Sequence, residues 1–95
     1  MQWQPWMLGF REGMYYMLTG DNMSGTRAAE LGFANEAVPS AELDAKVLDV
    51  AARVAIVPSD LQMVNKRSVH RQMEAMGIRN GLRVGTELQA LATYT

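Results

Sequence analysis

The sequence contains no cysteine, and histidine occurs once, at position 70. Small secreted domains usually need disulfides, so the absence of cysteine favours a reducing, cytoplasmic setting. Zinc sites are built from cysteine and histidine clusters, and none exists here, so we expect no metal site. No stretch approaches the ~20 apolar residues that span a bilayer, and the first residues lack the pattern of a signal peptide. The sequence therefore predicts a cytoplasmic chain with no metal site and no membrane partner.

An excess of charge of one sign is also missing. Nine Lys and Arg residues stand against ten Asp and Glu residues, which gives a net charge of −1. Residues 59–95 hold five basic and three acidic side chains, a mild bias that suits a solvated helix face or an anionic ligand. No recognised motif or interleaved aromatic residue accompanies these basic residues, so we expect no nucleic-acid partner. They are Lys66, Arg67, Arg71, Arg79 and Arg83.

Aromatic residues make up only 7% of the 95 residues, whereas methionine occurs eight times. Methionine is flexible and fills irregular gaps in cores and contact surfaces. A chain of this length forms one domain at most and buries roughly 60–65% of the surface that its unfolded form exposes. We therefore expect a small core of marginal stability.

The spacing of apolar residues predicts a mainly helical chain. Residues 2–6 are expected to be an irregular lead-in, because the residue before a proline avoids the helical region. Ser24 stands where an N-cap is expected, and Ser59 with Gln62 has the form of a capping box. We expect helices over residues 9–18 (interrupted at Gly13), 24–32, 40–57, 59–76 and 78–91.

Two features indicate that the chain packs against something else. One short strand is expected at residues 33–38, closed by Pro39, and a single strand has no neighbour for its backbone groups. The last helix contains Gly81 and Gly85, each of which costs ~1 kcal/mol relative to alanine. Two glycines four residues apart allow another element to approach closely. We therefore expect a partner, or a larger fold to which the chain belongs.

Several short motifs follow one another along the chain. Residues 16–24 read Tyr-Met-Leu-Thr-Gly-Asp-Asn-Met-Ser, and residues 28–39 read Ala-Ala-Glu-Leu-Gly-Phe-Ala-Asn-Glu-Ala-Val-Pro. Residues 40–43, 51–55 and 64–69 read Ser-Ala-Glu-Leu, Ala-Ala-Arg-Val-Ala and Val-Asn-Lys-Arg-Ser-Val. In their order and spacing, over residues 5–92, these motifs resemble the C-terminal portion of the enoyl-CoA hydratase/isomerase (crotonase) superfamily.

The resemblance implies a mainly α fold, the C-terminal helical (trimerization-type) region of a crotonase-like α/β spiral fold. It implies that residues 1–39 end the core and that residues 40–95 form the helical region. Intact members act on acyl-CoA, with two backbone N–H groups that stabilise an enolate and, in hydratases, two glutamates that move protons. In the family these groups lie upstream of the segment that this chain resembles. The implied partners are the acyl-CoA substrate of the intact family and further copies in a homo-oligomer.

The chain is therefore interpreted as a fragment of an enoyl-CoA hydratase/isomerase-family protein that is inactive alone. A non-enzymatic helical self-association module is the alternative. The resemblance identifies neither the acyl substrate nor the reaction, since hydration, isomerization, dehalogenation and thioester hydrolysis diverge through residues outside this segment.

No catalytic residue is assigned from the sequence. His70 lies on the polar side of its helix without a nucleophile motif, and Asp21 and Glu36 have turn and strand-edge explanations. The glycines are scattered over several elements and form no phosphate loop, so no cofactor is expected. Trp6 and Leu8 are the candidate substrate-binding residues, because the equivalent stretch of the family enters a helix beside the acyl pocket. Plain packing is the alternative role for both.

Overall fold

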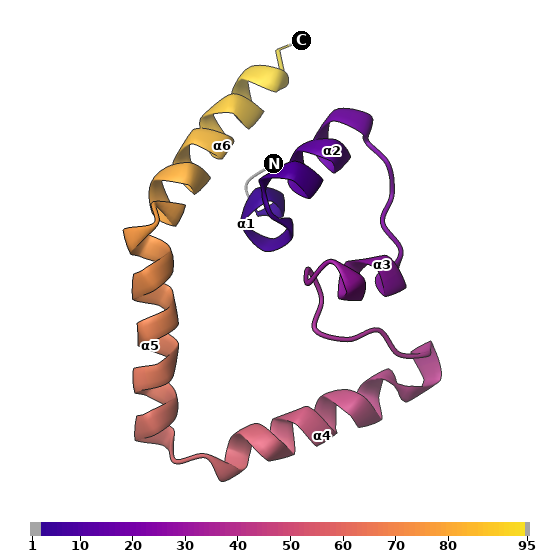
Figure 1. The fold of residues 1–95 in the computed structure, drawn as a ribbon, viewed down its shortest axis with the longest axis vertical. Coiled ribbons are helices and arrows are strands. Elements are labelled where there is room, and N and C mark those ends of the chain that lie inside the picture. The colour runs from indigo at the N-terminus through magenta and orange to yellow at the C-terminus, as the bar shows by residue number, and fades with distance from the viewer. Residues whose placement is uncertain (1–2, 95) are drawn as a thin grey trace. The chain divides into compact units, whose positions relative to one another are not determined.

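The computed structural model describes residues 3–94, and its regular elements are helices (Figure 1). The predicted mainly α class is confirmed. The elements are α1 (Gln4–Leu8), α2 (Phe10–Thr19), α3 (Gly25–Glu30), a 3₁₀ turn η1 (Ser40–Glu42), α4 (Leu43–Ile56), α5 (Ser59–Ala75) and α6 (Ile78–Ala92). Within residues 3–94, no helix combines the length and the apolar character needed to cross a bilayer.

The described residues fall into two compact units. One contains residues 3–37 together with 77–94, and therefore α1, α2, α3 and α6. The other contains Val38–Met76, and therefore η1, α4 and α5. The family-based boundary between residues 39 and 40 stays a prediction, because it concerns the intact fold.

The first unit begins with a helix where an irregular lead-in was expected. Residues Gln4–Leu8 form α1, and Pro5 lies in its first turn. A proline is tolerated there because the first backbone N–H groups of a helix have no intrahelical partner. The expected interruption of the next helix at Gly13 is also wrong, since α2 runs through it, and Gly13 is buried.

The helix α3 begins and ends as the sequence predicts. The Ser24 hydroxyl accepts a hydrogen bond from the backbone N–H of Arg27 at 3.1 Å, which makes it the N-cap. At the other end Gly32 has φ +82°. The N–H of Phe33 donates to the carbonyl of Ala28 at 2.9 Å, and the N–H of Gly32 to that of Ala29 at 3.3 Å. These two bonds form a Schellman motif, which satisfies the last carbonyls of the helix.

The predicted strand at residues 33–38 is not formed. Residues 33–35 are bends, and 36–38 have no regular structure. A strand needs a neighbour for its backbone groups, and the described residues contain no other strand. The Phe33 and Ala34 N–H groups instead both donate to the Ala28 carbonyl, at 2.9 and 3.1 Å. The start of this segment thus closes α3.

In the second unit, α5 lacks the expected capping box. Pro58 occupies the N-cap position, no side chain caps the helix, and Ser59 is its first residue. The Gln62 side-chain amide donates to the carbonyl of Val54 in α4. The same Val54 carbonyl, in the last turn of α4, also accepts the backbone N–H of Val57 at 3.1 Å. Neither α4 nor α5 has a buried residue.

Candidate functional site

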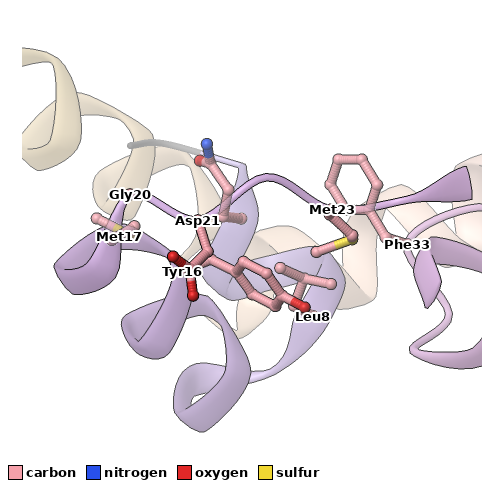
Figure 2. Close-up of a pocket in the computed structure, with 8 residues that line it drawn as sticks. Leu8, Tyr16, Met17, Gly20, Asp21, Met23 and Phe33 are labelled. Atoms are coloured by element: carbon pink, nitrogen blue, oxygen red, sulfur yellow. The ribbon is translucent and has the colours of Figure 1, made fainter.

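A cavity of about 340 Å³ lies in the first unit, between α1, α2 and the segments that flank α3. Figure 2 shows Leu8 beside the Tyr16 ring, with Met23 between Leu8 and Phe33. Four lining residues are apolar and large, and three carry polar side-chain groups. The lining residues are Gln4, Leu8, Tyr16, Met17, Gly20, Asp21, Met23 and Phe33.

Leu8 reaches the cavity because α1 packs closely on α2. A Cβ atom added to Gly13 would lie 2.8 Å from the Cα of Pro5 and 3.0 Å from its backbone nitrogen. Only glycine therefore allows the first turn of α1 to approach α2 this closely. Leu8 ends α1 and is 9% exposed, one of the few buried apolar side chains among the described residues.

The turn after α2 brings Asp21 and Met23 back to the same cavity. Gly20 has φ +70°, a left-handed conformation that reverses the chain, and its N–H donates to the Tyr16 carbonyl at 3.0 Å. The Thr19 hydroxyl donates to the Tyr15 carbonyl at 2.9 Å and accepts from the Asp21 N–H at 3.2 Å. The turn is thus held by hydrogen bonds on both sides of Gly20.

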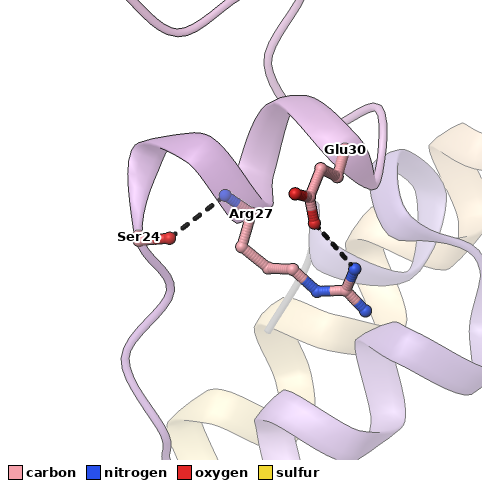
Figure 3. Close-up of polar contacts among 3 residues, drawn as sticks. All are labelled: Ser24, Arg27 and Glu30. Atoms are coloured by element: carbon pink, nitrogen blue, oxygen red, sulfur yellow. Dashed lines mark hydrogen bonds and ion pairs between the residues drawn. The ribbon is translucent and has the colours of Figure 1, made fainter.

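Two groups of polar contacts lie around the cavity. The Tyr15 hydroxyl donates to the Asp21 carboxylate over 3.4 Å, which is a long bond. On α3, the Arg27 guanidinium pairs with the Glu30 carboxylate at 3.0 Å (Figure 3). Glu30, and after it the Tyr16 side chain, raise the pKa of Arg27. Arg27 therefore stays charged, but the pair is exposed and contributes little to stability.

The lining offers binding surface and little reactive chemistry. Asp21 is its one carboxylate, Tyr16 supplies a phenol, and the lining contains no histidine. General acid–base catalysis usually needs a second titratable group, with a pKa near the operating pH, within reach of the first. Among residues 3–94, no group of three or more His, Cys, Asp or Glu residues is placed to hold a metal ion. The large side chains of the lining, Leu8, Met17, Met23 and Phe33, are mainly apolar.

Comparison with known proteins identifies the family. Residues 1–91 match the family model described as enoyl-CoA hydratase/isomerase. The chain belongs to the enoyl-CoA hydratase/isomerase family. This confirms the crotonase resemblance that the motifs of residues 16–69 carry.

Two curated relatives of this enoyl-CoA hydratase/isomerase-family chain are much longer than it is. A Mycobacterium tuberculosis protein, provisionally named enoyl-CoA hydratase EchA13, is 33% identical over 78 residues, which are 82% of this chain and 24% of that protein. The hydroxycinnamoyl-CoA hydratase-lyase of Pseudomonas fluorescens is 41% identical over 44 residues, 46% of this chain and 16% of that enzyme. The chain thus spans about a quarter or less of these relatives. No solved structure matches it.

The structure separates the two candidate substrate-binding residues of this family member. Leu8 lines the cavity, whereas Trp6 does not and instead contacts Phe10 and Gly81. Acyl contact by either residue stays a prediction. His70 is exposed on α5, as expected from its polar helix face.

Sequence reasoning missed most of the cavity lining. Tyr16, Met23 and Phe33 were not singled out, and Asp21 was assigned only to a turn. The sequence signal for these residues is the turn at Thr19–Gly20. A chain that reverses after a helix runs back alongside the last turn of that helix, so the residues after Gly20 lie near Tyr16. A glycine after a helix marks the end of that helix, but the spacing of residues does not reveal on which side of α2 the chain returns.

Proposed function

We propose that this chain is the C-terminal helical portion of an enoyl-CoA hydratase/isomerase-family protein that acts on acyl-CoA. Its role is structural: it contributes a wall of the acyl pocket and an interface between copies in a homo-oligomer. In the intact family, the oxyanion-hole N–H groups and the glutamates that move protons come from another part of the fold. The chain alone is proposed to be inactive, and its cytoplasmic location stays a prediction.

The observation that carries this proposal is the exposed apolar face of α4. Leu43, Val47 and Val54 follow one another at spacings of four and seven residues, which places them on one side of the helix. They are 51%, 56% and 52% exposed, respectively. Exposed apolar stripes of this kind mark surfaces that another protein surface covers. In a homo-oligomer, the stripe of one copy is covered by another copy.

The pocket-wall part of the proposal rests on Leu8. It is buried, ends α1 and lines the 340 Å³ cavity with Met17, Met23 and Phe33. These side chains suit an acyl chain and supply no catalytic group.

Charge placed on the α4 stripe tests the oligomer. In the double variant Val47→Glu/Val54→Glu, we expect a self-association constant about 30-fold weaker than that of the unaltered chain. Burying the exposed half of each valine contributes roughly 1 kcal/mol, so losing both costs about 2 kcal/mol. The helix content should stay the same, because both side chains are half exposed in one copy. Sedimentation velocity over a range of concentrations measures the association, and far-UV circular dichroism measures the helix content.

The matched control is Ala52→Glu. Ala52 is exposed and lies about half a turn away from the stripe, so the same charge there should leave association unchanged. A chain that is monomeric before substitution, or equal weakening by the control and the double variant, would contradict the proposed interface. A folded oligomer that does not bind acyl-CoA would instead favour the non-enzymatic self-association module.

A further inference from the structure

The short helix α1 cannot hold its own position. It has five residues, Gln4–Leu8, far fewer than the ~12–15 that an isolated helix needs. Its place therefore depends on the elements that it contacts. One contact is already described, the approach of Pro5 to Gly13 of α2. The other is with Gly81 of α6, which follows Trp6 by 75 residues (81 − 6).

Trp6 makes this second contact. A Cβ atom added to Gly81 of α6 would lie 2.9 Å from Cζ2 and 3.1 Å from Nε1 of the Trp6 indole. The ring therefore lies directly against the bare backbone of Gly81. The indole and the Phe10 ring of α2 form an edge-to-face pair, with the ring centroids 6.3 Å apart and the planes at 71°. The indole is thus held between α2 and α6.

The contact of Trp6 with Gly81 links α6 to the cavity through α1. No residue of α6 lines the cavity, but Leu8 does, two residues after Trp6 in the same short helix. Ile78 and Gly85 are the buried residues of α6, and this helix belongs to the same compact unit as α1. Trp6, which contacts Gly81, and Leu8, which lines the cavity, therefore belong to the same five-residue helix.

We infer that α6 fixes the position of the cavity wall. Trp6, whose ring packs on Gly81, is a positioning residue that holds Leu8 in place. This assigns Trp6 a role other than contact with a ligand. It also explains why α6 carries a glycine at position 81, where alanine would favour the helix. The positioning depends on the contacts of the chain and not on which ligand the cavity takes.

The experiment replaces Gly81 with alanine, which adds a methyl group where the Trp6 ring packs. The full chain also carries Trp3→Phe, so that Trp6 is its only tryptophan. The added Cβ pushes on the indole, so we expect the Trp6 emission to move to longer wavelength. We also expect the Leu8 methyl resonances to shift and the urea midpoint to fall, although alanine alone favours a helix. Gly25→Ala is the control, because a Cβ there meets nothing within 4 Å. It should leave the Leu8 methyl resonances in place.

Removing the ring supplies the second arm. In the Trp6→Leu background, Gly81→Ala meets no indole, so it should raise the urea midpoint and leave the Leu8 methyl resonances where Trp6→Leu alone puts them. If the Gly81→Ala chain does not fold, recovery of the fold in the double variant Trp6→Leu/Gly81→Ala supports the positioning role of α6. Three results would overturn it: Leu8 resonances that do not respond to Gly81→Ala, the same effect of Gly81→Ala in both backgrounds, or a double variant that also fails to fold.

Discussion

Replacing Leu8 with alanine is expected to lower the free energy of unfolding by about 3 kcal/mol, the middle of the range for buried leucines. Leu8 is one of the few buried apolar side chains of the described residues, and it borders an existing cavity. The variant loses the transfer free energy of the removed atoms, and the cavity grows because the short helix α1 cannot collapse onto it. Urea unfolding followed by circular dichroism measures the change.

Leu18→Ala is the matched control for this substitution. Leu18 lies in α2 of the same unit but is 80% exposed, so its truncation should change stability by less than about 0.5 kcal/mol. Leu8→Met keeps the volume and should cost less than about 1.5 kcal/mol. Equal losses for Leu8→Ala and Leu18→Ala would show that Leu8 is not part of a core in solution.

The second large effect is expected from Gly13→Ala. An added Cβ would lie 2.8 Å from Pro5 Cα and 3.2 Å from the carbonyl carbon of Gln4. Both contacts are with backbone, so no rotamer change relieves them, and α1 has to move as a whole. Overpacking costs about 1–3 kcal/mol, and displacement of Leu8 adds to this. Alanine regains ~1 kcal/mol of helix propensity, so we expect a net loss of about 2 kcal/mol in urea unfolding.

Gly25→Ala separates this clash from the general effect of alanine in a helix. Gly25 begins α3, and a Cβ there meets nothing within 4 Å. The substitution should therefore be neutral or slightly stabilising. Gly13→Ala that stabilises as much as Gly25→Ala would show that α1 is not packed on α2 as described.

The helices could be predicted because their start and stop signals are local. Ser24 caps α3 through the N–H of Arg27, three residues away, and Gly32 closes it through bonds to Ala28 and Ala29. The same local logic failed at Ser59, where the tertiary bond from Gln62 to Val54 competes with a capping box. It also failed at Pro5, since a proline disfavours a helix before it and suits the first turn of one.

The remaining errors and omissions come from contacts between distant residues. The short strand at residues 33–38 was predicted from weak alternation, but a strand depends on a neighbour that local spacing cannot supply. The cavity lining joins Leu8, Met23 and Phe33 from three segments, and the contact of Trp6 with Gly81 joins the two ends of the chain. The pair Gly81 and Gly85 did predict a close approach on α6, and Gly81 makes one. Only the identity of the neighbour needed the structure.

Hydration of crotonyl-CoA by the purified chain tests most directly whether these 95 residues carry structure without catalysis. Among residues 3–94, the cavity lining contains a single carboxylate, Asp21, and no histidine, so these residues supply no acid–base pair. We predict that the enoyl absorbance decays at the same rate with the unaltered chain, with the Asp21→Asn variant and with buffer alone. Decay above the buffer rate that disappears in Asp21→Asn would contradict this and place catalysis within the chain.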